Sequence, residues 1–251
     1  MRFRVATFNL HQGLKRWEQR RELIFAQLVE LRADILCLNE VAIPIDSGRW
    51  LWQRARKEVL EYSYLQQSKT GALWDVEGQG ILTHFPVLES GFLDYESRNR
   101  IAQVARLCIG KRVVDVYLTH LHHIKVEDGL REYQVQQLLR WIESRDSPDA
   151  RIVCGDFNAT PEMRSVQLMQ KHFIATQLEP TFATPLRYST DAAKSPTGEH
   201  EGVFSVCLDY IWYQPSLKML QGGRCFDKPS TDDPTLWPSD HVGVWADFEL
   251  A

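Results

Sequence analysis

The sequence lacks any long hydrophobic run. No window approaches the roughly 20 consecutive apolar residues that a membrane-spanning helix needs. An apolar, strand-like run begins as early as Phe3, which leaves no room for the basic start and apolar stretch of a signal peptide. We therefore expect a protein without a transmembrane segment.

Cysteine pairs are also missing. The chain has five cysteines, an odd number, and no two lie within a few residues of each other. They are Cys37, Cys108, Cys154, Cys207 and Cys225. This spacing argues against a disulfide framework or a zinc site, and it predicts reduced thiols in the core. Together with the missing leader, it predicts a cytoplasmic location.

Basic charge is not in excess. The 29 basic and 33 acidic residues leave a formal net charge of −4. Proteins that coat nucleic acid non-specifically usually have a strong basic excess, so the composition argues against that class while allowing a local basic groove. The 251 residues fit one globular domain over 1–251, which we expect to be a monomer.

Strand-like and helix-like segments alternate along the chain. Helical periodicity predicts helices over 17–32, 49–60, 127–144 and from Pro161 to about His172. Short β-prone runs predict strands at roughly 62–67, 79–83, 87–93 and 101–109, besides those described next. The alternation predicts an α/β fold. The longest irregular stretch, Pro180 to Gly202, is predicted to be a substrate-facing loop.

Polar side chains recur at the ends of apolar strands or next to them. They are Asn9, Glu40, His120, Asp156 followed by Asn158, Asp209 within the run 206–213, and Asp240-His241 before the run 242–250. Because a buried carboxylate is costly unless it is paired or bound to metal, the repeated acids suggest a shared cation. An Asp with an Asn suits phosphate-ester chemistry, since one holds a cation or a proton and the other donates to a phosphoryl oxygen.

In order, these fragments resemble the endonuclease/exonuclease/phosphatase superfamily, the metal-dependent phosphoesterases that include DNase I, exonuclease III, neutral sphingomyelinases and deadenylases. The matching pieces run from end to end of the chain. They are Thr7-Phe8-Asn9, Leu38-Asn39-Glu40, Gly80-Ile81-Leu82-Thr83 with Pro86, Thr119-His120-Leu121, Gly155-Asp156-Phe157-Asn158, Leu208-Asp209-Tyr210-Ile211 and Ser239-Asp240-His241. The resemblance implies a four-layer α/β/β/α sandwich of two packed mixed sheets.

The resemblance also implies a metal site. Glu40 matches the family residue that binds Mg²⁺ or Mn²⁺, and Asn9 and Asp240 match positions that complete or support that site. The alternative for Glu40 is a strand-end carboxylate that caps the next helix.

Catalytic roles follow in the same way. Asp209 would fix the tautomer of His241, and His241 would act on the attacking water or on the phosphoryl group. Asp156 would orient or deprotonate the water, Asn158 would hold a phosphoryl oxygen, and His120 would contact the scissile phosphate. Whether Asp156 or His241 is the base stays open at this point.

Three further residues are candidates for substrate contact. His122 shares a strand face with His120 if the strand continues, Arg131 begins the next helix, and Arg100 precedes a strand. The alternative for Arg131 and Arg100 is solvated surface, as it is for the neighbouring His123.

The sequence thus predicts a Mg²⁺- or Mn²⁺-dependent phosphodiesterase, with a nuclease acting on short or single-stranded nucleic acid as the leading interpretation. Hydrolysis of a phospholipid or small phosphodiester, as by the sphingomyelinases, is the alternative. A catalytically inactive binding module is a further alternative, although the chain keeps every acid and histidine of the pattern. The Tyr and Asn signature of the abasic-site endonucleases is missing, and so is the Cys-Asp-Arg of the inositol-polyphosphate 5-phosphatases, since Cys207-Leu208-Asp209 stands there.

Overall fold

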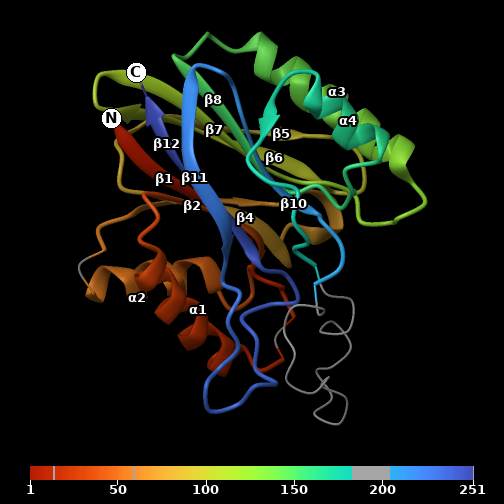
Figure 1. Ribbon diagram of the computed structural model, residues 1–251. Coiled ribbons are helices and arrows are strands. Elements are labelled where there is room, and N and C mark those ends of the chain that lie inside the picture. Colours follow the sequence, from red (N-terminus) through yellow and green to blue (C-terminus); the bar gives the residue numbers. More distant parts are fainter. Residues whose placement is uncertain (14, 59, 183–203, 251) are drawn as a thin grey trace.

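The protein is described by a computed structural model over residues 1–13, 15–58, 60–182 and 204–250. Within these ranges two six-stranded sheets pack face to face, and a pair of helices covers the outer face of each (Figure 1). The predicted four-layer α/β/β/α sandwich is confirmed.

The first sheet contains both ends of the described chain. Its strand order is β11-β12-β1-β2-β4-β3. The strands are β1 (Arg2–Asn9), β2 (Ile35–Ala42), β3 (Ser63–Ser68), β4 (Glu77–Thr83), β11 (Leu217–Cys225) and β12 (Gly243–Leu250). Helices α1 (Trp17–Leu31) and α2 (Ser47–Lys57) pack on its outer face, and a short 3-10 helix, η1 (Gly71–Leu73), follows β3.

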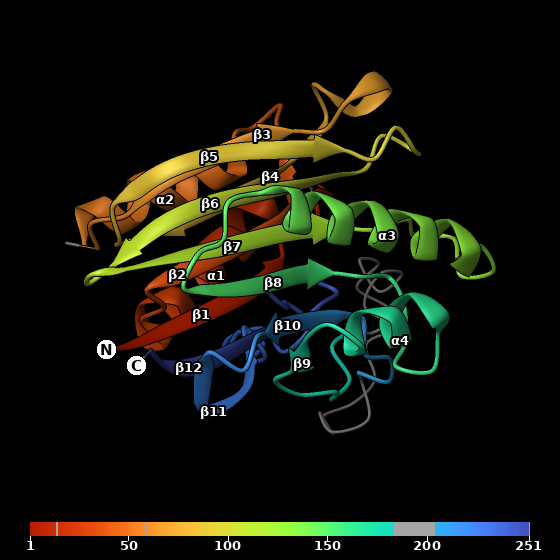
Figure 2. The same cartoon turned by 90° about the horizontal axis from the view of Figure 1, so that it is seen from above.

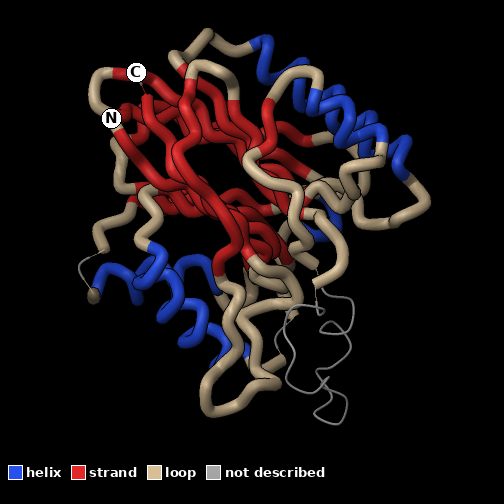
Figure 3. Tube along the Cα trace, viewed as in Figure 1, coloured by secondary structure: helices blue, strands red, loops and turns tan. Residues whose placement is uncertain are grey.

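The second sheet is built from the middle of the chain, in the order β5-β6-β7-β8-β10-β9. The strands are β5 (Val87–Asp94), β6 (Ile101–Ile109), β7 (Arg112–His120), β8 (Ala150–Asp156), β9 (Ile174–Ala175) and β10 (Asp209–Tyr213). Helices α3 (Asp128–Ser144) and α4 (Arg164–Gln170) pack on its outer face. In Figure 3 the strands form the centre, with helices on two opposite sides.

The central strands are apolar on both faces because both faces are covered. Between the sheets, alternate residues such as Val5, Cys37, Val116 and Cys154 form one core cluster. The residues between them point outward under the helices and form two further clusters. This layering buries most residues of the central strands, so the strand ends are where their polar side chains can meet a shared, accessible space.

Strand direction gathers these ends at one edge. β1 and β2 run parallel, as do β7 and β8, while β10 starts antiparallel to the end of β8. Figure 2 shows β7 and β8 ending on the same side of the molecule. The carboxyl ends of four strands and the start of a fifth therefore meet, and they carry most of the polar residues predicted to be functional.

A β-bulge shapes the end of β2. The pairing of β2 with β4 shifts between Leu38 and Val41, so that Asn39 and Glu40 together oppose a single residue of β4. Glu40 has a left-handed backbone, with a φ of 53°, which is uncommon for a residue with a side chain. The bulge turns consecutive side chains toward the space between the sheets.

The structure contains β9, η1 and β11, which were not predicted, and it starts β10 later than predicted. β11 does not appear in the sequence pattern, because adjacent glycines, Gly222 and Gly223, weaken the strand signal and pairing with β12 supplies the order. Asp209 begins β10, whereas the prediction placed it inside a strand from Val206 to Tyr213. Most of the predicted substrate-facing loop, 183–202, lies outside the described residues.

Gly155 provides a test of how closely the strands pack beneath the site. Its φ is 129°, and a Cβ atom there would lie 2.0 Å from the Thr119 carbonyl oxygen on β7. We expect Gly155→Ala to lower the free energy of unfolding by about 1–3 kcal/mol, because a backbone contact must shift and the conformation is strained for alanine. Urea unfolding followed by circular dichroism measures the change.

Gly129 in α3 is the matched control, since a Cβ atom there would meet nothing within 4 Å. Gly129→Ala should leave stability unchanged or raise it by up to about 1 kcal/mol. A Gly155→Ala protein as stable as the wild type would contradict the close-packing explanation.

Candidate active site

Three strands of the second sheet place His120, Asp156 and Asp209 side by side. His120 pairs with Asp156 in the register of β7 and β8, and Asp209 pairs with Asp156 in the register of β10 and β8. All three side chains are buried. Asp156 is therefore the centre of a row of titratable groups.

Asn9, at the end of β1, connects this row to the first sheet. Its Nδ2 donates to Asp156 Oδ2 and to Glu40 Oε1, at 3.1 Å in each case. The second oxygen of Glu40 accepts a hydrogen bond from the Gln12 backbone at 3.0 Å. One amide thus holds two carboxylates from opposite sheets toward the same space.

Asn39 joins the sheets directly below that point. Its Nδ2 donates to the Thr119 carbonyl oxygen, and its Oδ1 accepts from the Asp156 backbone N–H, both at 3.0 Å. The side chain is fully buried, so both bonds form away from water. The sequence analysis used Asn39 only as part of a motif, and its cross-sheet role required the structure.

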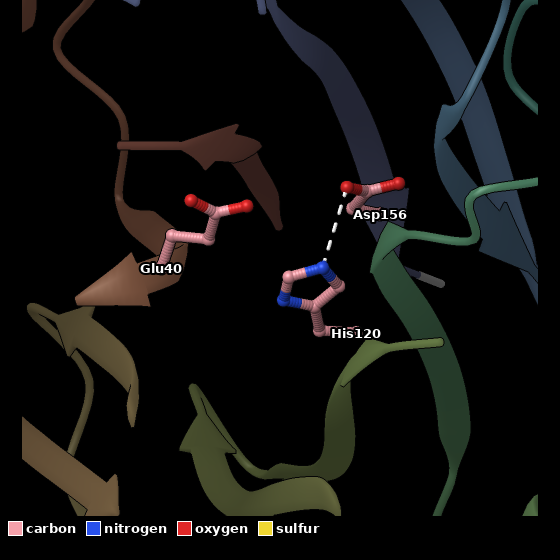
Figure 4. A group of neighbouring side chains, drawn as sticks. All are labelled: Glu40, His120 and Asp156. Atoms are coloured by element: carbon pink, nitrogen blue, oxygen red, sulfur yellow. Dashed lines mark ion pairs between the residues drawn. The ribbon is translucent and has the colours of Figure 1, made fainter. Parts of the chain in front are cut away.

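The side chains of Glu40, His120 and Asp156 face one another across the gap between the sheets (Figure 4). Each offers one ligand atom, and these atoms lie within 4.8 Å of one another. Hard carboxylate oxygens are the donors that Mg²⁺ and Mn²⁺ prefer. The donor set therefore fits the divalent ion expected from the sequence, with Asn9 in direct contact with two of its carboxylates.

Asp240 and His241 lie in the loop that precedes β12. Asp240 Oδ1 lies 3.4 Å from His11 Nδ1 and accepts from the Ser239 hydroxyl at 3.2 Å. His241 Nδ1 donates to Asp209 Oδ2 at 2.8 Å, and the same oxygen accepts from the Thr181 hydroxyl at 2.7 Å. The predicted contact between Asp209 and His241 is present, and it leaves His241 Nε2 facing Asp156 Oδ2 at 3.9 Å.

A second carboxylate–imidazole pair is formed by Glu77 and His120. His120 Nδ1 lies 3.1 Å from Glu77 Oε1, and Lys69 forms a buried ion pair with the same carboxylate. His120 Nε2 lies 3.6 Å from Asp156 Oδ2. Glu77 and Lys69 were missed in the sequence, since Glu77 opens a strand of ordinary composition and Lys69 follows another. A charged residue flanking a buried strand is the signal that could have drawn attention to them.

The two histidines have opposite pKa shifts. Burial, Arg100 and Lys69 hold the pKa of His120 well below its usual range. Burial also opposes the charged form of His241, but Asp209 outweighs it and raises the pKa of His241 to about 10. Burial and the charge of Asp209 raise the pKa of Asp156 to about 7 in the metal-free protein. At neutral pH the row therefore holds a neutral and a charged imidazole on either side of a carboxyl group that titrates near neutrality.

These groups form the floor of a cavity of about 760 Å³. Three of its lining residues, Arg100, His123 and Lys125, are basic and form what we call the basic wall, and four others are apolar, namely Met163, Phe182, Val206 and Leu208. Asn158 also lines the cavity, where its backbone N–H donates to Asp156 Oδ1 at 2.8 Å and its Nδ2 to the Leu121 carbonyl oxygen at 3.1 Å.

Two of the predicted substrate contacts are corrected by their burial. Arg131 is fully buried, and its guanidinium donates hydrogen bonds of 2.7–3.1 Å to the carbonyl oxygens of His122, Ile124 and Lys125. His122 is 3% exposed and bonds to Glu127 at 2.7 Å. Neither lines the cavity, whereas His123, which is exposed as expected, does.

The contact between Asp209 and His241 predicts how the stability of the protein depends on pH. Because the folded-state pKa of His241 is raised from 6.5 to about 10, its charge stabilises the native state fully below pH 6.5, and this contribution is lost as the pH rises through 10. In metal-free protein, Asp209→Asn should lower the His241 pKa seen in NMR titration and weaken the fall in stability over this pH range.

Asp232→Asn, at an exposed position, is the matched control and should behave as the wild type. An unchanged His241 titration in Asp209→Asn would show that another group holds the proton.

No helix in the described parts of the chain combines the length and the apolar character needed to cross a bilayer.

Comparison with known proteins gives matches over almost the whole chain. Nocturnin of Xenopus laevis is 25% identical over 266 residues, covering 94% of this chain and 65% of that protein. The CCR4-Not complex 3'-5'-exoribonuclease subunit Ccr4 of Kluyveromyces lactis is 22% identical over 301 residues, covering 94% of this chain and 38% of that protein. The chain thus spans less than two thirds of the length of these curated relatives.

Among solved structures, TDP2 of D. rerio complexed with a single-strand DNA product superimposes with a TM-score of 0.76 at 17% identity, covering 99% of both chains. This likeness shows that the two proteins share a fold. The model of the Endonuclease/Exonuclease/phosphatase family matches residues 6–241, which include every residue of the cavity floor. The chain therefore belongs to the Endonuclease/Exonuclease/phosphatase family.

Proposed function

We propose that the protein is a divalent-metal-dependent phosphodiesterase that cleaves short or single-stranded nucleic acid. The observation that carries the proposal is the position of Asp156 Oδ2, 3.6 Å from His120 Nε2 and 3.9 Å from His241 Nε2, with a second carboxylate behind each imidazole. Hydrolysis of a phosphodiester needs a proton acceptor for water beside groups that stabilise negative charge, and this row offers both.

The metal would be held by Glu40, with Asn9 and Asp240 completing or supporting its site. A bound Mg²⁺ or Mn²⁺ neutralises charge on the phosphoryl oxygens and lowers the pKa of bound water. Glu40 fits this role because its oxygens are oriented by Asn9 and by the Gln12 N–H. The helix-capping alternative fits less well, since α2 begins at Ser47 with no side-chain cap.

Asp156 is the better candidate for the general base. In the metal-free protein Asp209 outweighs burial and raises the pKa of His241 to about 10, so at neutral pH the protonated ring is suited to hold a phosphoryl oxygen. Asp156, with its pKa near 7, is suited to accept one. Asn158 would donate to a phosphoryl oxygen, and His120 would contact the scissile phosphate from the opposite side of Asp156.

Nucleic acid is favoured as substrate by relatives whose names describe such activity. One is an exoribonuclease subunit, and a structural neighbour is complexed with a single-strand DNA product. A small phosphodiester is the second candidate, because a cavity of about 760 Å³ lies within the usual size range of small-molecule sites. An inactive binding module is disfavoured by the complete set of acids and histidines.

A substrate panel separates these candidates. The purified protein is assayed with single-stranded DNA, duplex DNA, RNA, sphingomyelin and bis-p-nitrophenyl phosphate, each with Mg²⁺ and with Mn²⁺. We expect cleavage of single-stranded nucleic acid above duplex DNA. Turnover confined to sphingomyelin or to the small diester would favour the alternative, and no turnover of any diester with either ion would overturn the proposal.

Glu40→Gln tests the metal assignment. It keeps the shape of the side chain and removes its charge, so we expect at least a tenfold loss of turnover together with weaker Mn²⁺ binding in calorimetry. Glu61→Gln, at an exposed position before β3, should behave as the wild type. Full activity of Glu40→Gln at low Mg²⁺ would exclude Glu40 as a ligand.

A further inference from the structure

We propose that the basic cavity wall, defined as Arg100, His123 and Lys125, binds a second phosphate group of the substrate in addition to the one that is cleaved. The inference rests on the proposed phosphodiesterase function and specifies the substrate further. It selects molecules that carry a phosphate on one side of the scissile diester.

Arg100 is the buried anchor of this wall. It directly precedes β6, is 6% exposed and lines the cavity. Its Nη2 donates to His123 Nδ1 at 3.0 Å, while its Nη1 is buried without a hydrogen-bond partner and lies 4.0 Å from Glu77 Oε1. A buried guanidinium N–H without an acceptor is costly, and a phosphate oxygen is the kind of acceptor that arginine binds best.

His123 is oriented by that contact. Arginine can only donate, so Nδ1 of His123 is the acceptor, and a neutral ring carries its proton on Nε2. The contact therefore fixes the His123 ring beside Arg100, and both residues line the cavity.

Lys125 extends the wall toward solvent, and Arg131 fixes the loop that carries it. Arg131 Nη2 donates to the Lys125 carbonyl oxygen at 2.8 Å, and Nη1 donates to the carbonyl oxygens of His122 and Ile124 at 3.1 and 2.7 Å. A fully buried arginine thus anchors the backbone on both sides of His123. The wall is preorganised, although Lys125 itself is exposed.

Nearby acids do not cancel this charge. Glu77 forms its closest ion pair with Lys69, and Glu127 contacts His122 at 2.7 Å and Arg98 at 3.5 Å. The remaining acids of the cavity, Glu40, Asp156 and Asp240, belong to the floor where the divalent ion is expected. The wall therefore keeps a net positive charge beside the floor.

The test uses thymidine dinucleotides that differ only in a terminal phosphate. TpT, pTpT and TpTp are compared by kcat/KM with Mn²⁺, and by calorimetric Kd in EDTA, where no cleavage occurs. We expect one of the phosphorylated forms to bind and react about tenfold better than TpT, as for a charge-assisted hydrogen-bonded contact. TpTpT is included to separate two sources, since a gain with it identifies the next diester of a chain, and a gain confined to pTpT or TpTp identifies a terminal phosphate.

Lys125→Ala should reduce the preference for the extra phosphate severalfold, and Lys125→Glu should reduce it further. Lys125 is exposed, so neither substitution disturbs the core, and circular dichroism checks that the variants are folded. Lys111→Ala is the control, because Lys111 lies in the turn between β6 and β7, at the opposite end of these strands from Arg100. It should keep the wild-type preference.

Equal Kd values for TpT, pTpT, TpTp and TpTpT would overturn the second phosphate site. So would a loss of preference in Lys111→Ala as large as in Lys125→Ala, because the effect would then be general charge. If no diester is cleaved with either ion, the proposed function fails, and the binding experiment in EDTA still decides whether the wall binds phosphate.

Discussion

The side-chain amide of Asn39 holds the two sheets together where the site is built. It donates to β7 and accepts from β8, and it stands in the bulge that also turns Glu40 toward the opposite sheet. Both bonds are buried, so losing either would leave a polar group without water or partner. The relative position of Glu40 and Asp156, and with it any shared cation, depends on this contact.

Electrostatic asymmetry then gives similar residues different chemistry. His120 and His241 flank the same Asp156 oxygen, and each has a carboxylate behind it. Burial, Arg100 and Lys69, which pairs with Glu77, keep His120 neutral, whereas Asp209 has no lysine or arginine ion pair among the described residues and keeps His241 charged. The cations Arg100 and Lys69 beside His120 thus distinguish two pairs that are otherwise alike.

Much of the floor could be predicted from the sequence, because strand ends are where buried strands can expose polar side chains. That argument, with the family resemblance, located Asn9, Glu40, Asp156 and His241, and it gave the layers of the fold.

What it could not predict depends on contacts between distant segments. Glu77 contributes to the site because β4 pairs with β2, which places the Glu77 carboxylate beside His120 of the other sheet. Arg131 looked like a surface residue at a helix start, yet the loop before α3 folds over it, and its two Nη atoms donate to three backbone carbonyl oxygens of that loop. That same folding exposes His123 to the cavity in place of His122.

The most direct test of this account is a crystal structure of the protein soaked in Mn²⁺, with anomalous diffraction to locate the ion. We predict a strong anomalous peak within coordination distance of a Glu40 oxygen, in the space that Glu40 shares with His120 and Asp156. An ion bound elsewhere, with Glu40 still bonded only to Asn9 and Gln12, would contradict the account.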